Sequence, residues 1–247
     1  MTATVLVLGG TGEARKLAAE LAGEDLRVIS SLAGRVRDPK LPVGEVRVGG
    51  FGGVEGLTTW LQDNAVDAVV DATHPFASTM TASAARATAM LGIAFLVLRR
   101  PGWAPEPGDR WHWVDSLDEA AEVLETLGDR VFLTTGRRDL PVFARLDKFF
   151  LVRSVDAPDT SLGRMRVVLG RGPFTVDGEI ELLREHRVDV LVTKDSGGGM
   201  TAAKLVAARH LGLPVVILRR PPLPPAVTEV ASVPEAVEWL IRGSGAG

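Results

Sequence analysis

The chain has 247 residues, of which 46% are hydrophobic and 24% charged, and its formal net charge is -3. This length allows one large α/β domain or two smaller ones, and the mild acidity argues against nucleic-acid binding. The chain has no cysteine, which excludes disulfides, thiolate metal sites and cysteine nucleophiles. It also has no tyrosine, which excludes the Tyr–Lys proton relay of short-chain dehydrogenases.

The sequence carries no export or membrane signal. The first apolar run lacks a basic flank and a cleavage site, so we expect a core strand there and not a signal peptide. No stretch reaches the length of a membrane span. We therefore expect a cytoplasmic protein that has no membrane partner and is a monomer or a weak homo-oligomer.

A glycine cluster near the N-terminus is the feature around which the chain is organised. Residues 5–8 predict a buried strand, residues 9–12 read Gly-Gly-Thr-Gly, and a helix pattern begins at Glu13. Glycines permit a tight turn and let a pyrophosphate approach the N–H groups of the helix N-terminus. The match to G-x-G-x-x-G is imperfect, because Arg15 stands at the third conserved place, so an ordinary strand–helix turn is the alternative.

The end of the second predicted strand, residues 26–31, bears on the choice of cofactor. An NAD-binding unit places an acidic residue there to hold the ribose, whereas this chain has Ser31, Gly34 and Arg35. A hydroxyl and a guanidinium would accept a 2′-phosphate that a carboxylate would repel. The pattern favours NADP(H) over NAD(H), with a solvated loop arginine as the alternative reading of Arg35.

Two further strand ends carry candidate site residues. A predicted strand at residues 43–48 runs into the glycine-rich stretch 49–53, which includes Gly50 and suggests close approach of a ligand. A buried strand ending at Asp71 is followed by Thr73 and His74, where open parallel sheets bind their ligands. A lone histidine is often structural, but the proline after His74 fixes its backbone and makes a functional role equally plausible.

The predicted elements then alternate between helix and strand. Residues 79–91 predict a helix, residues 93–98 a strand, and residues 104–109 a linker rich in proline and charge. A second α/β series begins at residue 111, so we predict a cofactor domain at residues 1–103 and a substrate domain at residues 104–247.

An internal repeat relates the two halves. Residues 47–101 recur near residues 169–221, and both segments end in Leu-Arg-Arg-Pro. We therefore expect an α/β protein with two related Rossmann-like domains, parallel sheets and a ligand cleft between the domains. The repeats differ at one loop, where Lys194, Ser196 and Gly197 predict an anion-binding nest, with a flexible turn as the alternative.

Together these motifs resemble the precorrin-6A reductases, NADPH-dependent enzymes of cobalamin biosynthesis. The resemblance covers nearly the whole chain and rests on motifs at residues 9–15, 31–35, 49–53, 71–77, 135–137, 172–174 and 193–199. It implies two Rossmann-like domains, NADPH as cofactor, and reduction of the precorrin-6A macrocycle to precorrin-6B.

We combine these observations into three sets of site residues and no metal site. The cofactor set is Gly9, Gly10, Thr11, Gly12, Glu13, Ser31, Gly34, Arg35, Gly50 and Thr73. The substrate set, meant for a polycarboxylate, is Arg137, Lys194, Ser196, Gly197 and Lys204. The catalytic set is His74, Asp71 and Lys194.

Three alternatives stay open from the sequence. The substrate could be the cobalt-containing counterpart of precorrin-6A, since no residue here must discriminate a metal in the ring. The chain could also be a non-catalytic NADP(H) sensor that acts on a protein partner. An ATP or sugar-nucleotide enzyme is disfavoured, because the chain lacks a P-loop and an acidic ribose residue.

Overall fold

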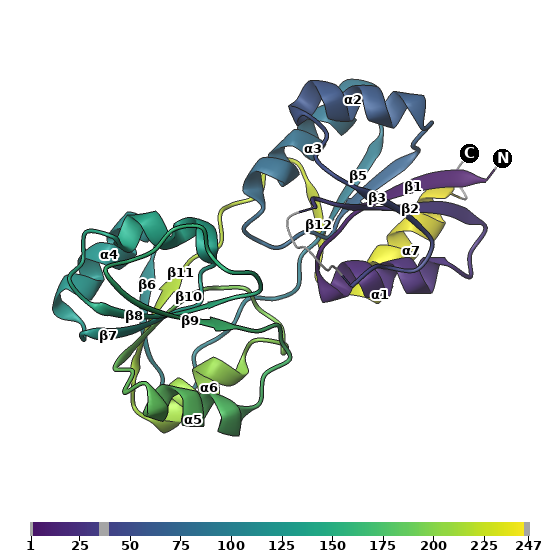
Figure 1. The fold of residues 1–247 in the computed structure, drawn as a ribbon. Coiled ribbons are helices and arrows are strands. Elements are labelled where there is room, and N and C mark those ends of the chain that lie inside the picture. Colours follow the sequence, from purple (N-terminus) through teal and green to yellow (C-terminus); the bar gives the residue numbers. More distant parts are fainter. Residues whose placement is uncertain (1, 35–39, 245–247) are drawn as a thin grey trace. The chain divides into compact units, whose positions relative to one another are not determined.

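A computed structural model describes residues 2–34 and 40–244 of the chain (Figure 1). The chain forms two compact units, so each is described by itself. Unit 1 contains Met1–Pro101 together with Pro221–Gly247, and unit 2 contains Gly102–Arg220. The chain therefore crosses from one unit to the other twice. Within the described ranges, no helix is both long and apolar enough to cross a membrane.

Unit 1 is a six-stranded parallel sheet in the order β12-β5-β4-β1-β2-β3. Its strands are β1 (Ala3–Leu8), β2 (Leu26–Leu32), β3 (Glu45–Val48), β4 (Ala68–Asp71), β5 (Ala94–Leu98) and β12 (Thr228–Val230). Its helices are α1 (Gly12–Leu21), α2 (Gly53–Asp63), α3 (Ser78–Leu91) and α7 (Val233–Ser244). The elements within residues 1–101 follow the predicted ones closely, because most of their strands are apolar runs bounded by glycine or polar residues.

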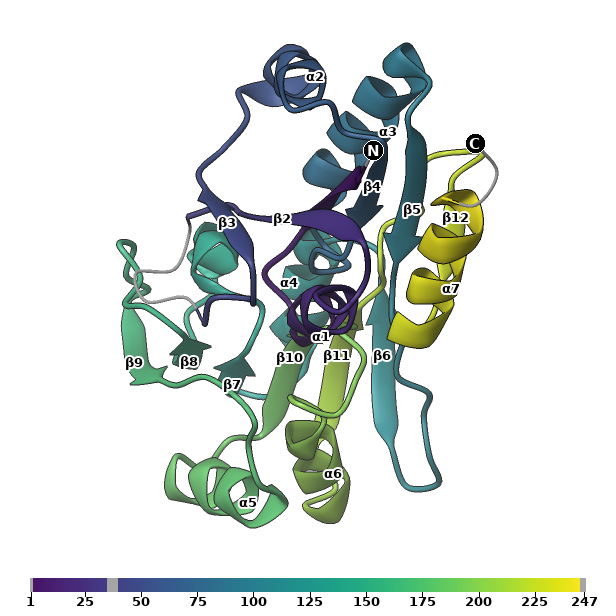
Figure 2. The ribbon, with the colours of Figure 1, turned by 90° about the vertical axis from the view of Figure 1, so that its right-hand side faces the viewer.

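The sheet of unit 1 is covered on both faces, with α1 and α7 on one side and α2 and α3 on the other (Figures 1 and 2). Neighbouring residues of β1 point to opposite faces: Val7 packs with α1 and α7, whereas Leu6 packs with α2 and α3. Burial on both faces explains why β1 is a continuous apolar run and not an alternating one.

The last segment of the chain belongs to unit 1, which corrects the expected assignment of residues 104–247 to one domain. Strand β12 pairs with β5, with Val230 opposite Leu98. Helix α7 adds Val233, Ala236 and Leu240 to the core that contains α1. The three residues of β12, of which only Val230 is apolar, gave no sign of their partner, because strand pairing is a long-range contact.

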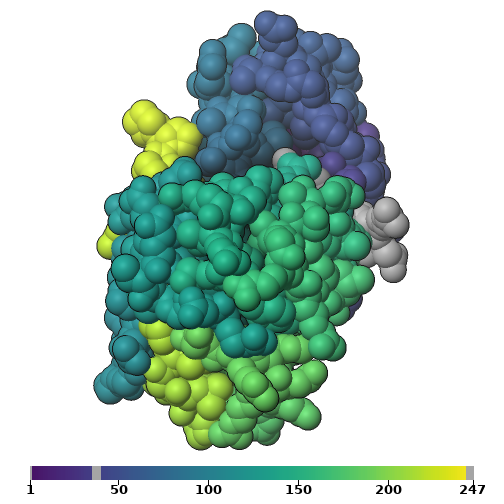
Figure 3. Space-filling model, turned by 60° about the vertical axis from the view of Figure 1, so that its left-hand side comes forward, coloured from purple at the N-terminus to yellow at the C-terminus, as the bar shows by residue number. Residues whose placement is uncertain are grey.

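Unit 2 is also a six-stranded parallel sheet, in the order β6-β11-β10-β7-β8-β9. Its strands are β6 (Arg110–Val114), β7 (Arg130–Leu133), β8 (Phe149–Ser154), β9 (Arg164–Leu169), β10 (Val190–Lys194) and β11 (Pro214–Leu218). Its helices are α4 (Leu117–Thr126), α5 (Val176–Glu185), α6 (Ala203–His210) and the 3₁₀ helix η1 (Arg137–Phe143). Figure 3 shows its surface, where teal residues of its first half adjoin green and yellow-green residues of its second half.

The predicted linker at residues 104–109 lies inside unit 2 and does not connect the units. It closes a turn in which the Glu106 N–H donates to Asp109 at 2.7 Å, and Arg209 of α6 forms ion pairs with both carboxylates. The crossings between units lie instead at Pro101–Gly102 and Arg220–Pro221. The proline and charged residues at 104–109 belong to a surface turn, and such turns have the same composition as linkers.

Both sheets have the same strand order, which confirms the internal repeat. Counted from β1 and from β7, each order is 3-2-1-4-5-6, that of doubly wound dinucleotide-binding folds. The sixth strand is exchanged along the chain: β6 follows β5 in sequence but completes unit 2, and β12 follows β11 but completes unit 1.

In each sheet the winding reverses between the first and fourth strands, the point at which such folds bind ligands. In unit 1 this switch point lies beside residues 9–12, the first glycine loop. In unit 2 it lies beside residues 194–202, here called the lysine loop. All three predicted sets of site residues can be located relative to these two points.

Candidate functional site

The first glycine loop is fixed to both neighbouring strands. The Gly9 N–H donates to the Ser31 carbonyl at 2.9 Å, which ties the loop to β2. Thr11 caps α1, because its hydroxyl accepts from the Ala14 N–H at 3.1 Å. The same hydroxyl donates to the Ala72 carbonyl at 2.7 Å, just past the end of β4. The loop is thus held in one conformation before any ligand binds.

The space beside this loop suits a phosphate group. Gly10 has a φ of +116°, and nothing lies within 4 Å of the place where its Cβ would stand. Gly12 begins α1, whose first N–H groups have no acceptor within the helix. An open approach, backbone donors and the positive end of a helix are the features that bind phosphate in proteins.

Glu13 lies in the first turn of α1 and is held by an arginine. Arg100 Nη1 lies 2.7 Å from Glu13 Oε2, and both side chains are largely buried. A bare carboxylate at this place would repel a pyrophosphate, and the ion pair neutralises it. Glu13 therefore lies beside the glycine loop as part of an ion pair. The sequence pattern did not identify Arg100 as its partner.

Ser31 is joined by a cation that the sequence did not single out. In the parallel pairing of β2 and β3, Ser31 lies opposite Arg47. Arg47 Nη1 donates to the Ser31 hydroxyl at 3.1 Å and to the Gly49 carbonyl at 2.7 Å, and Nη2 donates to the Gly50 carbonyl at 2.7 Å. Gly50 therefore contributes a carbonyl that orients Arg47.

Arg47 is also stacked on aromatic rings. Its Cζ lies 3.7 Å from the centroid of the Phe51 ring and 5.6 Å from that of Trp60. Burial lowers the pKa of the Arg47 guanidinium, which nevertheless stays charged at neutral pH. The register of the two strands, which was not part of the sequence reasoning, was the signal that could have revealed this cation.

Two other members of the predicted cofactor set follow β2. Gly34 has a φ of +68°, in the left-handed region that favours glycine. The Gly49 N–H donates to the Leu32 carbonyl at 2.8 Å, which extends the β2–β3 pairing toward this turn. Arg35 lies outside the described residues.

Asp71 and Thr73 form one hydrogen-bonded group at the end of β4. Asp71 Oδ1 accepts from the Thr73 N–H at 3.0 Å and from the Thr73 hydroxyl at 2.7 Å. Asp71 is 2% exposed, and its Oδ2 has no hydrogen-bond partner among the described protein atoms. The buried carboxylate orients Thr73 at the switch point.

His74 follows directly, in a conformation set by the next turn. Its Nδ1 accepts from the Phe76 N–H at 3.3 Å, and the Ala77 N–H donates to the His74 carbonyl at 2.7 Å. Because Nδ1 is the acceptor, a neutral His74 carries its proton on Nε2. In this form His74 can donate a hydrogen bond from Nε2.

In unit 2, Lys194 at the end of β10 forms an ion pair. Its Nζ lies 2.6 Å from Asp139 Oδ2, and the two side chains are 19% and 15% exposed. Asp139 belongs to η1, which follows β7, so the pair joins the two strands at this switch point. The sequence identified Lys194 but not its carboxylate partner.

Arg137 and Ser196 flank this pair. Arg137 Nη1 donates to the Ala157 carbonyl at 3.2 Å, in the loop between β8 and β9. The Ser196 N–H donates to the Lys194 carbonyl at 2.7 Å, which tightens the chain as it leaves β10. Gly197 follows with a φ of +63°, a conformation that glycine adopts without strain.

Asp195 holds both ends of unit 2, a role that the sequence did not predict. Its Oδ1 accepts from the Trp103 N–H at 2.9 Å, and its Oδ2 lies 3.1 Å from Arg220 Nε. A Cβ on Gly102 would stand 2.5 Å from Oδ2, so a larger residue there would displace the Asp195 carboxylate. Asp195 thereby links the lysine loop to the two places where the chain crosses between units.

Lys204, a member of the predicted substrate set, is buried. The residue is 5% exposed, and its Nζ donates to the Thr201 carbonyl at 3.0 Å. Burial lowers the pKa of Lys204 to about 7, although the nearby Glu179 raises it and Arg153 lowers it further. In this conformation, the buried side chain supports the lysine loop through its hydrogen bond to Thr201.

The predicted residues therefore fall into two clusters. The described cofactor residues all lie in unit 1, around the first glycine loop, with His74 and Asp71 beside them. The substrate residues all lie in unit 2, around the lysine loop. Within the part of the chain that the structure describes, no three His, Asp or Glu side chains are grouped so as to hold a metal ion.

A duplicated doubly wound fold with a glycine loop at its first switch point defines a protein of the dinucleotide-binding class. Comparison with known proteins makes this class specific. The model of the family described as "Precorrin-6x reductase CbiJ/CobK" matches residues 4–241. The chain belongs to this family, and is therefore an oxidoreductase of cobalamin biosynthesis.

Individual relatives agree with the family match. A precorrin-6A reductase of Rhodococcus erythropolis is 55% identical over 239 residues, which cover 96% of each chain. A cobalt-precorrin-6A reductase of Priestia megaterium is 30% identical over 231 residues, covering 88% of this chain and 90% of the relative. A solved structure, "CobK precorrin-6A reductase", has a TM-score of 0.91 at 41% identity and covers 98% of this chain and 97% of its own.

Proposed function

We propose that the chain uses NADPH to reduce precorrin-6A, with the cofactor bound to unit 1 and the acidic macrocycle bound by unit 2. The observation that carries the cofactor assignment is the end of β2. A serine and a stacked arginine stand there, where an NAD-specific site would have a carboxylate. When bound, the nicotinamide would supply a hydride.

The first glycine loop supports binding of a pyrophosphate. The backbone at Gly10 is open, and the N-terminus of α1 points its donors at the switch point. The cap by Thr11 fixes that N-terminus, so little order would have to be gained on binding. The ion pair of Glu13 with Arg100 removes a charge that would oppose the phosphates.

We assign the 2′-phosphate to Ser31 and Arg47, with Arg35 as the further cation expected from the sequence. Arg47 is already oriented by two carbonyl oxygens and by the Phe51 ring, so its charge is held beside the Ser31 hydroxyl. An oriented guanidinium loses less entropy when it binds an anion than a mobile one does.

We further propose that Lys194, Arg137, Ser196 and Gly197 bind carboxylates of the macrocycle. The side chains supply cations, and the backbone of the lysine loop supplies N–H groups. Asp139 holds Lys194 until a substrate carboxylate competes for it. Lys204 would support the loop through its hydrogen bond to Thr201 and would not contact the macrocycle itself.

For proton transfer we propose His74, with Asp71 as a positioning residue. His74 would deliver the proton as an imidazolium and return to the neutral form, whose Nδ1 accepts the Phe76 N–H. Asp71 would act through Thr73, whose hydroxyl and N–H it binds. Hydride addition to the macrocycle requires one proton, and neither tyrosine nor cysteine is available to supply it.

The cobalt-free substrate is our first choice, because the 55% identical relative carries the name precorrin-6A reductase. Reduction of the cobalt-containing form is the second candidate, since a 30% identical relative carries that name. We expect a monomer or a weak homo-oligomer working in the cytoplasm, where nicotinamide cofactors circulate.

Cofactor oxidation by the purified chain tests this proposal. NADPH should be consumed only when precorrin-6A is present, and NADH should be consumed far more slowly. Turnover of the cobalt-containing substrate alone would favour the second candidate. Tight NADPH binding without turnover of either substrate would favour a sensor and contradict the proposed reaction.

A further inference from the structure

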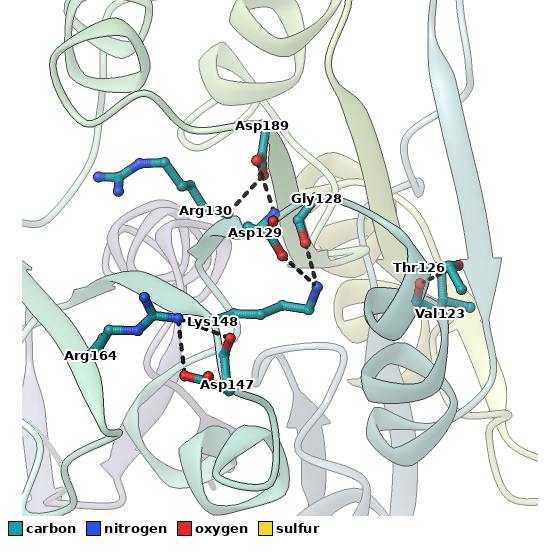
Figure 4. Close-up of polar contacts among 9 residues, drawn as sticks. All are labelled: Val123, Thr126, Gly128, Asp129, Arg130, Asp147, Lys148, Arg164 and Asp189. Atoms are coloured by element: carbon teal, nitrogen blue, oxygen red, sulfur yellow. Dashed lines mark hydrogen bonds and ion pairs between the residues drawn. The ribbon is translucent and has the colours of Figure 1, made fainter.

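Unit 2 buries two lysines in contrasting surroundings. Lys148, at the amino end of β8, is 8% exposed and donates to the Gly128 carbonyl at 2.5 Å and to Asp129 at 3.2 Å (Figure 4). The Asp129 side chain is 87% exposed, so Lys148 has a carboxylate partner at the edge of water. This is the usual arrangement of a buried lysine.

Lys204 lies in the first turn of α6, and within the described part of the chain it forms no ion pair. The acidic group that acts on it is Glu179 of α5, whose Oε1 already lies 2.7 Å from Arg153 Nη1 of β8. Glu179 and Arg153 therefore largely cancel each other's charge. The Arg153 guanidinium is stacked on the Phe174 ring, 4.0 Å from its centroid, which keeps it in place.

Two contacts of Lys204 connect it to the lysine loop. Its Nζ donates to the Thr201 carbonyl and lies 4.9 Å from the centroid of the Trp103 ring. Trp103 Nε1 in turn donates to the Gly198 carbonyl at 3.0 Å. Lys204 and Trp103 thus hold the loop from two sides while residues 198–200 stay exposed to solvent.

We propose that Lys204 is a positioning residue that orders the lysine loop for a carboxylate of the substrate, and that substrate binding takes up one proton at this lysine. The inference rests on the proposed role of the loop in substrate binding. A protonated amine donates more strongly to the Thr201 carbonyl and interacts favourably with the Trp103 ring, so the charged state holds the loop.

The uptake of a proton follows from thermodynamic linkage. An anion bound on the loop favours the charged form of a lysine beneath it, and the charged lysine favours the anion by the same factor. Burial lowers the pKa of Lys204 to about 7, opposed by Glu179 and assisted by Arg153. The free protein is therefore partly deprotonated at neutral pH, and binding draws a proton from solvent.

The first test is the pH dependence of the KM for precorrin-6A. In the wild-type protein this KM should rise above about pH 7, by at most about tenfold per pH unit, while the KM for NADPH does not follow it. Lys204→Arg keeps its charge and should give a KM without this rise. Lys204→Met should give a high KM throughout, and the matched control Lys148→Met should keep the wild-type profile.

The second test needs no turnover. In protein labelled with ¹³C at the lysine ε-carbons, the resonance that disappears in Lys204→Met should titrate near about pH 7. The amide resonances of residues 197–199 should follow the same midpoint and lose it in Lys204→Arg.

Titration of this lysine at an ordinary pKa, or an unchanged KM profile in Lys204→Arg, would overturn the inference. So would loop amides that do not respond to its protonation. Absence of any precorrin-6A turnover, with the lysine and loop titrating together, would instead contradict the proposed function and leave the coupling of lysine and loop established.

Discussion

The two units share one fold but differ where their first strands end. In unit 1, β1 runs into a glycine loop and a helix of 10 residues capped by Thr11. In unit 2, β7 runs into Gly136 and the 3₁₀ helix η1, which contains Pro141. A short 3₁₀ helix presents fewer aligned N–H groups than a capped α-helix. Unit 2 therefore offers fewer backbone donors for an anion at this place than unit 1 does.

The fourth strands of the two sheets differ in the charge of their last residue. In unit 1, β4 ends in a carboxylate bound to Thr73, and in unit 2, β10 ends in a lysine paired with Asp139. One switch point has an open glycine loop beside it, and the other has a half-buried ion pair. Duplication of a sheet thus fixes where a site lies, while the loops decide which charge it binds.

The largest expected effect concerns the C-terminal segment that returns to unit 1. Leu240→Ala, in α7, should lower the stability of unit 1 by about 2 to 5 kcal/mol, since it opens a cavity in the core shared with α1. Leu183→Ala is the matched control in unit 2. Protection against hydrogen exchange should weaken in β5 for the first variant and in β10 for the second. Loss of protection in β10 for Leu240→Ala would contradict the assignment of α7.

The next effect separates the two nicotinamide cofactors. Arg47→Ala should weaken NADPH binding by about 1.5 to 3 kcal/mol, because a charged hydrogen bond to the 2′-phosphate is lost. NADH binding should change much less. Arg27→Ala removes an exposed arginine that pairs with Glu45 in the same sheet, and it should leave both affinities unchanged. Equal losses for both cofactors in Arg47→Ala would refute the phosphate assignment.

A smaller effect compares equivalent glycines of the two units. Gly10 and Gly136 have φ values of +116° and +107°, and each has open space at its missing Cβ. Alanine at either place should cost about 1 to 2 kcal/mol of backbone strain. Only Gly10→Ala should also weaken NADPH binding, by about tenfold in titration. A similar loss in Gly136→Ala would place the cofactor in unit 2.

The last effect is a slope of stability with pH, small over any single pH unit. Lys204 has a pKa of about 7 when folded, against an ordinary value of 10.5, so between these values the unfolded chain binds the extra proton. Stability should therefore rise with pH in this window, by at most about 1.4 kcal/mol per pH unit, and Lys204→Met should remove the rise. Denaturant titrations at several pH values measure it, and a slope retained in Lys204→Met would assign it to another group.

Much of the fold followed from the sequence, because it is written in local patterns. Apolar runs gave the buried strands, the glycines gave the turns, and the repeat of residues 47–101 gave the duplication. The return of β12 to unit 1 was missed, since edge pairing depends on contacts between residues more than a hundred positions apart. The prediction of a linker at residues 104–109 was wrong, because surface turns and linkers have the same composition.

The candidate site was predictable in its positions but not in its partners. Strand ends located Ser31, Asp71 and Lys194, since parallel strands finish at one edge. Their contacts with Arg47, Thr73 and Asp139 depend on strand register and side-chain direction. Burial of Lys204 could not be predicted either, because a lysine after a glycine loop looks the same whether it points to solvent or under the loop.

The difference between the units is tested most directly by hydrogen exchange with NADPH alone. We predict that NADPH protects the amides of residues 9–14 and 49–53 in unit 1 and leaves those of residues 135–143 and 194–199 unchanged. Protection of the unit 2 segments, with unit 1 unaffected, would contradict the account, because it would place the cofactor at the switch point that we assign to the substrate.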